Sequence, residues 1–344
     1  MNSRLSIILV CVLCFFSCRR TQTYIPRHVE PAKVNVERFD SALLSIGTTD
    51  EDPATAVSRL YDEHPFFMPL FAEDIIGITD DTAALAEAIT LFLADTTYGF
   101  KATNERVQST FADISGIRHE LSDAFGRLVY LYPDTYVPNI CFFVSGFNAS
   151  ILFYNELKDG DLVPAIGVGL DMYLGSDYEY YNRVVYNYQK QTMRPECIAA
   201  DVMSCYLFHL FPFESHKNRL IDNMLYRGKI MYLLSLLLPE EQEYEVMGYK
   251  KEQWQWCEQH ERDIWHTMMD KHDLFKTDQM LISSYLNDGP FTSELSQQSP
   301  ARVGTWIGWR IARAYMQNNS DKTLQDLIAN NDAQELLEMS GYRP

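Results

Sequence analysis

NICFFVSGFNASILFYN, residues 139–155, decides the fold, because it is dense in the aromatic and branched side chains that favour β-strands. Residues 146–149 carry a turn signal in its middle, and this arrangement predicts a β-hairpin. A polar turn, KDGD at residues 158–161, then leads to AIGVGLDMYLG, residues 165–175. This second stretch predicts a third strand, so we expect one small β-element near the centre of the chain.

The sequence on both sides of this β-element carries the apolar spacing of helices. We predict helices over residues 53–64, 80–95, 104–132 with a break near Gly116, 195–211, 218–238, 250–271 and 300–316, and a last helix that begins after Asp332. Residues 173–188, with six tyrosines, predict a helical or irregular passage. The predicted fold class is therefore mostly α, of the α+β type: a helical body around a small central β-hairpin or sheet.

The first residues, MNSRLSIILVCVLCFFSCRR, have the form of an export signal. Arg4 precedes an apolar run over residues 5–16, which is shorter than the ~20 residues needed to cross a bilayer core. The residues FFS before Cys18 resemble a lipobox, so we predict that Cys18 is lipidated and anchors the protein to a membrane. The alternative is an ordinary signal peptide with an incidental cysteine.

The predicted organisation has three parts. Residues 1–17 form the lipoprotein signal peptide, residues 18–33 form a lipid-anchored tether, and residues 34–344 form a single globular domain, since no linker or repeat divides them. Arg19 stands where many lipoproteins of the inner membrane carry aspartate, and no acidic run follows Cys18. We therefore expect a lipid anchor in the outer membrane and a body in the periplasm.

The charge of the chain excludes one class of partner. The formal net charge is −18, and it becomes −19 when Arg4 leaves with the signal. Nucleic acids and anionic lipid surfaces attract clustered lysine and arginine, so we expect no nucleic-acid partner. The acidic residues are dispersed, which favours a solvated surface over a cation site.

Motifs that would carry chemistry are incomplete in this sequence. The glycines around Asp171 lack the third glycine of a dinucleotide fingerprint, no HExxH is present, and Ser145 lacks the GxSxG elbow. His119 and Asp123 share a helix face, for which a solvated polar face is the expected role. We therefore predict no catalytic residue, no metal site and no cofactor. Asp171 is either a site residue or a structural hydrogen-bond acceptor.

The remaining cysteines and one histidine suggest packing roles. No CxxC pair exists, and Cys197 and Cys205 are two helical turns apart, ~12 Å, so they cannot bridge each other. Buried free thiols are expected at the four cysteines that follow the anchor: Cys141, Cys197, Cys205 and Cys257. His209 lies inside an aromatic run and is expected to be a core histidine.

Several motifs in order along the chain carry a resemblance to a known family. They are Cys18 in its lipobox, ERFD at 37–40, GVGLDMYLG at 167–175, RGKIMY at 227–232, SPARVGTWIGWRIARAYM at 299–316 and SGYRP at 340–344. With these motifs the chain resembles the gliding motility lipoprotein B family (GldB-like) of Bacteroidota. The resemblance runs from the anchor to the C-terminus.

The resemblance implies a membrane-anchored component connected with the gliding apparatus and its secretion machinery. We accordingly expect a non-enzymatic envelope lipoprotein that binds or scaffolds other envelope proteins, through the membrane anchor and through partners of unknown identity. The motif residues that are candidates for a binding or structural role are Arg38, Asp40, Gly169, Asp171, Tyr173, Gly175, Gly228, Lys229, Trp306 and Gly308.

A fainter resemblance concerns the order of elements in zincin-type metallopeptidases. Arg227 and Gly228 stand where such enzymes carry Glu-Gly, and the helix after Pro195 lacks HExxH. The resemblance implies a zincin-like scaffold without its metal motif. Two alternatives to the scaffold function stay open: a hydrolase with Asp171, Glu196 and Asp201 near its cleft, and a small-ligand binding module that uses the aromatic surface over residues 173–188.

Overall fold

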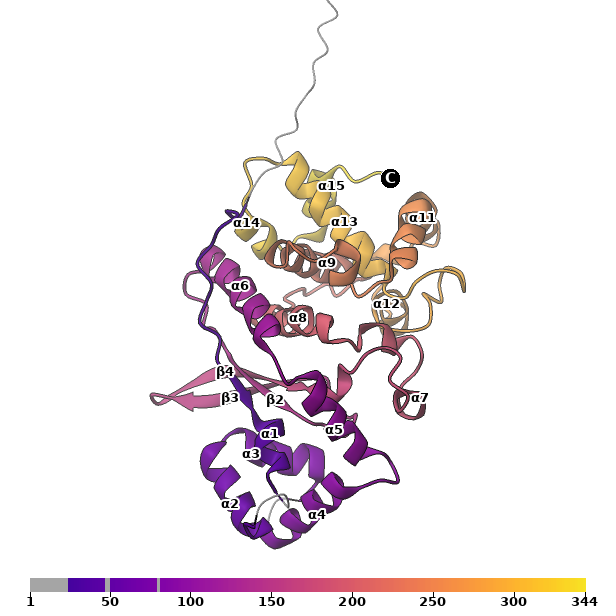
Figure 1. Ribbon diagram of the computed structural model, residues 1–344. Helices are drawn as coiled ribbons and strands as arrows, with labels where there is room; N and C mark the ends of the chain where they lie inside the picture. The colour runs from indigo at the N-terminus through magenta and orange to yellow at the C-terminus, as the bar shows by residue number, and fades with distance from the viewer. Residues whose placement is uncertain (1–23, 47–49, 79–80) are drawn as a thin grey trace, which may run out of the picture.

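The computed structural model describes residues 24–46, 50–78 and 81–344 (Figure 1). The predicted signal peptide and Cys18 lie outside the described residues. The described part contains fifteen α-helices and one four-stranded sheet, which confirms the mostly α, α+β class. Within this part no helix combines the length and the apolar composition that crossing a bilayer requires.

The sheet is mixed, and its strand order corrects the predicted hairpin. The strands are β1 (Val36–Arg38), β2 (Asn139–Phe143), β3 (Ile151–Lys158) and β4 (Asp161–Gly169), in the order β1-β2-β4-β3. β1 and β4 both run parallel to β2, and β3 is antiparallel to β4.

A hairpin over residues 139–155 is therefore wrong, because β4 lies between β2 and β3. The true hairpin joins β3 to β4 through Asp159 and Gly160, whose φ angles of 54° and 94° suit a tight turn. The third strand ends at Gly169 rather than at residue 175, and a 3₁₀ turn, η2 (Leu170–Met172), follows it.

The long predicted helices are present with small shifts at their ends. They are α2 (Pro53–Glu63), α4 (Thr82–Ala94), α5 (Phe100–Thr110), α6 (Ser115–Leu131), α8 (Ile198–Leu210), α9 (Leu220–Leu237), α11 (Lys251–Asp270), α13 (Val303–Asn318) and α15 (Ala333–Ser340). The break in residues 104–132 falls at residues 111–114, and Gly116 belongs to the first turn of α6. Asp332 caps α15 by accepting from the N–H groups of Gln334 and Glu335.

Short elements were missed by the sequence patterns. They are β1, α1 (Phe39–Leu44), α3 (Phe67–Leu70), the π-helical turn η1 (Phe71–Ile76), α10 (Glu243–Val246), α12 (Gln279–Leu286), α14 (Leu324–Ala329) and the 3₁₀ turn η5 (Asp273–Phe275). None of them exceeds eight residues, so the apolar period has at most about two turns in which to show itself. The predicted irregular passage contains α7 (Tyr181–Val184) and η3 (Gln189–Thr192), and η4 (Pro195–Cys197) precedes α8.

The sheet separates two groups of helices (Figure 1). Helices α1 to α5 lie on one side of it, and α6, α8, α9 and α13 lie on the other. Helix α8 packs against β3 and β4, and α9 then packs on α8 and on α13. The buried hydrophobic side chains of both groups belong to one cluster.

The α9–α13 crossing brings two backbones into direct contact. A Cβ atom on Gly308 would lie 1.9 Å from the carbonyl oxygen of Met224, and one on Gly228 would lie 2.0 Å from the carbonyl carbon of Gly308. Gly304 faces another neighbour, because its Cβ would lie 3.1 Å from the carbonyl oxygen of Tyr285 in α12. The two glycines of α13 therefore serve two different helix contacts.

Candidate functional site

A cavity of about 700 Å³ lies between the start of β3, the segment from η2 to η3, and helices α8, α9 and α13. The loop after α12 also contributes to its wall, through Asn287 and Asp288. The cavity reaches the surface, since the side chain of Asp288 is 70% exposed and Gln189 is exposed. Its wall includes residues from three of the family motifs, and it carries charged side chains, so we take it as the candidate site.

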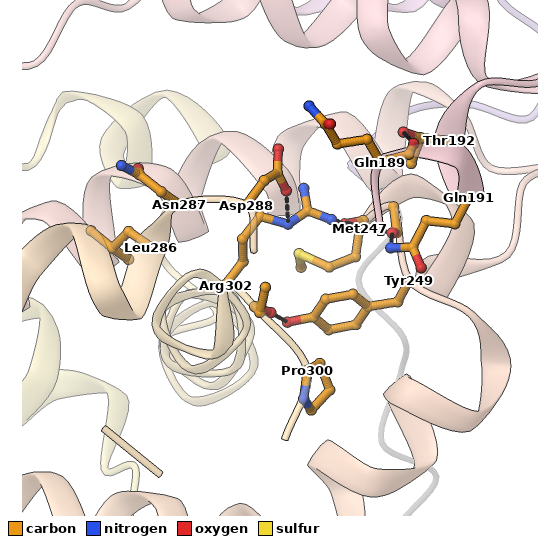
Figure 2. A network of polar contacts seen from close by, with 12 residues as sticks. Gln189, Gln191, Thr192, Met247, Tyr249, Leu286, Asn287, Asp288, Pro300 and Arg302 are labelled. Atoms are coloured by element: carbon orange, nitrogen blue, oxygen red, sulfur yellow. Dashed lines mark hydrogen bonds and ion pairs between the residues drawn. The ribbon is translucent and has the colours of Figure 1, made fainter. Parts of the chain in front are cut away.

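Arg302, which precedes the first turn of α13, is held at the cavity wall by three kinds of contact (Figure 2). Its Nε lies 3.0 Å from Oδ1 of Asp288, its Nη2 donates to the carbonyl oxygen of Met247 at 2.7 Å, and its guanidinium lies over the ring of Tyr249. The backbone of Arg302 has a left-handed φ of 58°, which non-glycine residues rarely adopt. Such a conformation is kept where the surroundings require it.

The wall behind Arg302 is fixed by further polar contacts. The hydroxyl of Tyr249 donates to the carbonyl oxygen of Ala301 at 2.6 Å, and Nε2 of Gln191 donates to that of Gly248 at 2.8 Å (Figure 2). These bonds tie the start of α13 to the loop before α11 and to η3. The position of Arg302 is therefore set by three separate segments.

Arg227, from α9, is the second cation of the cavity. Its Nη1 donates to the carbonyl oxygen of Leu286 at 2.6 Å and its Nη2 to Oδ1 of Asn287 at 3.1 Å. Burial, followed by the nearby charge of Arg302, lowers the pKa of Arg227. Two guanidinium groups thus face one space, and an anion placed there would relieve their repulsion.

Asp201, from α8, brings a carboxyl group to the same cavity. The hydroxyl of Tyr173 donates to its Oδ2 at 2.8 Å. Burial raises the pKa of Asp201 to about 6, while the Tyr173 hydroxyl and the charge of Arg302 partly counteract this rise. Near neutral pH this carboxyl group can therefore exchange a proton, and in its protonated form it can donate a hydrogen bond to a ligand.

Thr305, in the first turn of α13, adds a polar atom with no protein partner. Its side chain is buried, with 6% of the residue exposed, it lines the cavity, and its Oγ1 has no hydrogen-bond partner among the described residues. A buried hydroxyl without a partner costs free energy, about 1–3 kcal/mol. The cavity therefore contains a hydroxyl that a bound molecule could satisfy.

Asp171, at the centre of the glycine-rich stretch, is a structural acceptor. It is 1% exposed, and its carboxylate accepts from the N–H of Ser145 at 2.7 Å, the hydroxyl of Ser145 at 3.0 Å and the N–H of Phe147 at 2.7 Å. Burial raises its pKa, and these donors oppose the rise. Asp171 thereby fixes the loop that carries the chain from β2 to β3.

The three acids of the hydrolase alternative do not converge. Asp201 lines the cavity, whereas Asp171 is occupied by the β2–β3 loop. Glu196 is outside the cavity lining, with a side chain that is 65% exposed and 4.0 Å from the guanidinium of Arg194. Of these three acids only Asp201 lines the cavity, while Asp171 and Glu196 each adjoin a lining residue, Met172 and Cys197.

Arg38 and Asp40 of the ERFD motif form a partly buried ion pair at β1 and α1, and α1 lies on the other side of the sheet from α8, α9 and α13 (Figure 1). Nε and Nη2 of Arg38 donate to the two carboxylate oxygens of Asp40 at 2.8 and 2.7 Å, and Nη1 donates to the carbonyl oxygen of Phe111. Nε2 of Gln108 also donates to Asp40. The motif joins β1 and α1 to the end of α5 and contributes no residue to the cavity.

Gly169 and Gly175 are required by the backbone. A Cβ on Gly169 would lie 2.0 Å from the carbonyl oxygen of Ala149, so no larger residue fits between β4 and the β2–β3 loop. Gly175 has a φ of 109°, a region that favours glycine, and its N–H donates to the carbonyl oxygen of Met193 at 3.0 Å. The latter bond closes the segment that forms one wall of the cavity.

Lys229 and Trp306 have structural positions. Lys229 is 3% exposed, and its Nζ donates to the carbonyl oxygens of Ile328 and Asn330 at 3.0 and 2.5 Å, which caps the end of α14. Burial lowers the pKa of Lys229 to about 8. Trp306 is fully buried and packs edge-on against Trp254.

The tyrosines of residues 173–188 are divided among several roles rather than forming one aromatic surface. Tyr173 and Tyr181 are buried, and the hydroxyl of Tyr181 donates to the carbonyl oxygen of Asp171 at 2.8 Å. Tyr186 and Tyr188 stack with ring centroids 5.7 Å apart, and Tyr188 lines the cavity. Part of the stretch is therefore buried and fixes the backbone near Asp171, and part of it forms the rim of the cavity.

Two smaller expectations have clear outcomes. His209 is exposed on α8 and stacks on Phe153 of β3, with ring centroids 4.0 Å apart, so its prediction as a core histidine is wrong. His119, by contrast, lies on a solvated face 3.8 Å from Asp123, with its side chain 76% exposed.

No group of three or more potential metal ligands comes together in residues 24–46, 50–78 and 81–344. The cysteines in these ranges are free thiols.

The sequence patterns missed the residues that define the cavity. Arg302 and Thr305 lie in the SPARVGTWIGW motif, but they were not singled out, because an arginine before a helix ordinarily remains in solvent. Arg227 stands out in the sequence only because it occupies the position of the zincin glutamate, and no pattern there indicates that it lines a binding site. The signal that could have found all three is the nearness of each to a glycine that forces a close helix contact: Gly228 in α9, and Gly304 and Gly308 in α13.

The comparisons with known proteins agree with the motif pattern. A family model described as gliding motility protein GldB matches residues 22–344, nearly the whole chain. No curated protein and no solved structure matches the chain. This family is not a known enzyme family, and its name as a lipoprotein family indicates membrane anchoring. The chain belongs to the family of gliding motility protein GldB, and membership supports a gliding-motility-associated lipoprotein.

Proposed function

We propose that the protein is a non-enzymatic lipoprotein, anchored in the outer membrane through Cys18, whose body in the periplasm binds other envelope proteins. The observation that carries the binding role is the cavity of about 700 Å³. Its two arginines are held in place by carbonyl oxygens, and the hydroxyl of Thr305 has no described partner. A cavity with a partly apolar wall and a few fixed polar groups is typical of binding sites.

The side chains of the cavity favour binding over group transfer. Arg227 and Arg302 are permanent cations that donate and cannot accept a proton at physiological pH. Asp201 can accept or donate a proton. The hydroxyl of Tyr173 already donates a hydrogen bond to it, and this bond holds the carboxyl group in position. The site is therefore suited to recognising a molecule by charge and shape.

A photo-reactive side chain in the cavity tests the binding role. We propose replacing Tyr188, at the cavity rim, with the tyrosine-like photo-cross-linker p-benzoylphenylalanine in the full chain expressed in its own cells. The control places the same group at Tyr130 of α6, which is 52% exposed and outside the cavity lining. Adducts with envelope proteins from position 188 and few from position 130 are expected. Equal or absent adducts at the two positions would refute the proposal.

The anchor has its own test. Cys18→Ala removes the thiol that the lipid would occupy, so the variant is expected in the soluble periplasmic fraction while the parent chain stays with the outer membrane. Fractionation of envelopes with an antibody against the body measures this. A Cys18→Ala protein that has lost its signal and still sediments with membranes would contradict the anchor.

A further inference from the structure

We propose that the cavity, together with the free edge of β3, captures the extended C-terminal end of a partner protein. The partner's last residues would pair antiparallel with β3, and its terminal carboxylate would lie between Arg227 and Arg302. This inference rests on the proposed binding function and names the chemistry of the partner. It follows from the strand edge, the strand direction and the charges of the cavity.

The first observation is that β3 is an edge strand with a free side. β3 pairs with β4 alone among the described strands. The N–H of Gly169 donates to the carbonyl oxygen of Ser150 at 2.9 Å, so even-numbered residues of β3 bond to β4. The backbone groups of residues 151, 153, 155 and 157 therefore point outward. An edge of this kind accepts a further strand through its main chain.

The direction of β3 fixes the direction of the partner. Ser150 and Ile151, at the start of the strand, line the cavity, and the strand then runs away from it to Lys158. A segment antiparallel to β3 runs toward the cavity and delivers its C-terminus there. A parallel segment would deliver a terminal amine next to two arginines, which charge repulsion disfavours.

The charges at the end of this path suit a carboxylate. Arg227 forms no ion pair with a described carboxylate, and Arg302 pairs with Asp288, whose side chain is 70% exposed to solvent. Asp201 and Glu245 also line the cavity, and the hydroxyl of Tyr173 already donates to Asp201. A carboxylate between the guanidinium groups would accept charge-assisted hydrogen bonds, which are among the strongest in proteins.

The unpartnered hydroxyl of Thr305 is the second observation that points to a ligand. Only 6% of Thr305 is exposed, and its Oγ1 has no hydrogen-bond partner among the described residues. Thr305 and Arg302 line the same cavity. A terminal carboxylate has two oxygens, so one can accept from a guanidinium while the other accepts from the hydroxyl. Both the guanidinium and the hydroxyl of Thr305 then have a hydrogen-bond acceptor.

The apolar part of the wall suits the partner's final side chain. Met172, Phe208, Met231 and Leu234 line the cavity beside the polar groups. Methionine side chains adapt to irregular shapes, so several apolar residues fit such a wall. We expect the partner to end in an apolar residue, with tolerance for which one it is.

Paired peptides test the carboxylate. The probes are an array of peptides of about eight residues, long enough at about 3.3 Å per residue to cover β3 and enter the cavity, each with an apolar last residue. Each is made with a free C-terminal carboxylate and as the C-terminal amide. The full chain in detergent is expected to bind a subset of the carboxylates, and amidation is expected to weaken binding about tenfold or more in fluorescence anisotropy. Equal binding of both forms, or binding of no peptide, would overturn the proposal.

A proline in the exposed edge tests the strand pairing. Asn155→Pro removes an outward N–H of β3 and leaves the β4 ladder intact, because residue 155 does not donate to β4. Asn155→Val keeps the N–H and is the matched control. We expect at least a fivefold weaker affinity for the best peptide in the proline variant and an unchanged affinity in the valine variant, with equal thermal unfolding of the two. Equal affinities would refute pairing on β3.

The two proposals fail in different ways. Cross-linking of envelope proteins at position 188 without binding of any free C-terminal peptide would retain the binding role and refute the captured C-terminus. Binding of the carboxylate peptides without cross-linked envelope proteins would retain the peptide site and refute the proposed function.

Discussion

Helices α9 and α13 meet in two regions that differ sharply. At their crossing, Gly228 and Gly308 let the two backbones touch, and no side chain fits between them. Less than two turns away along each helix, Arg227 and Arg302 face a cavity of about 700 Å³. The same pair of helices therefore forms both a contact between two backbones and part of the wall of the candidate site.

The difference indicates how the fold holds the site open. The cavity is bordered by helices that cannot slide toward each other, because the crossing is already at backbone contact. Arg227 is then held by the carbonyl oxygen of Leu286 and the side chain of Asn287, and Arg302 is held by the carbonyl oxygen of Met247 and an ion pair with the exposed Asp288. Rigid packing in one region supplies the preorganisation that binding needs in the other.

The largest expected effect is at the crossing. Gly308→Val would place side-chain atoms on the carbonyl oxygen of Met224, so the helices must separate. We expect a loss of about 3 kcal/mol or more in the free energy of unfolding, measured by urea titration followed by circular dichroism. Gly116→Ala in the first turn of α6 is the control, because its Cβ would meet nothing within 4 Å and alanine favours helices. Equal stabilities of the two variants would refute the rigid crossing.

An intermediate effect is expected at Asp201. Its pKa in the folded protein is about 6, above the value near 4 of the unfolded chain, so the folded state binds the proton more tightly. The contribution of this group to stability is therefore present at low pH and lost as pH rises from about 4 to 6, by about 2–3 kcal/mol.

Asp201→Asn removes that dependence. The difference in free energy of unfolding between variant and parent is expected to grow in favour of the variant from pH 4 to pH 7, since asparagine still accepts from Tyr173. Urea titrations at several pH values measure it. A pH-independent difference would show that the carboxyl group is not raised in pKa by the cavity.

The smallest expected effect on stability is at Thr305. Thr305→Val replaces a buried unpartnered hydroxyl by a methyl group of similar size, so stability is expected to rise by up to about 1 kcal/mol. Affinity for the carboxylate peptides is expected to fall severalfold in the same variant, because one donor is lost. A variant that is destabilised and binds unchanged would indicate that the hydroxyl serves the fold and not a ligand.

The sequence predicted the fold class and the long helices because their signals are local. Apolar spacing placed α9 and α13 within a few residues of their ends. The strand order was not predictable, because the two polar residues of the true turn, Asp159 and Gly160, and the loop at residues 146–149 give similar turn signals. Only the pairing of β2 with β4 decides between them.

The candidate site was predicted in part. Tyr173 was singled out, and it lies at the cavity through its bond to Asp201, whereas Asp171, Lys229 and the ERFD pair proved to hold the fold together. Arg227 and Arg302 are far apart along the chain, and no local pattern indicates that they face one space. Such a convergence is a property of the packing.

Hydrogen exchange of the full chain, with and without the tightest carboxylate peptide, tests the central claim most directly, since it reports on β3 and on the α9–α13 crossing at once. The account predicts slower exchange of the outward amides of residues 151, 153 and 155 when the peptide is present, with the crossing already protected in its absence. Unchanged exchange over β3 with peptide bound, or fast exchange at the crossing without it, would contradict the account.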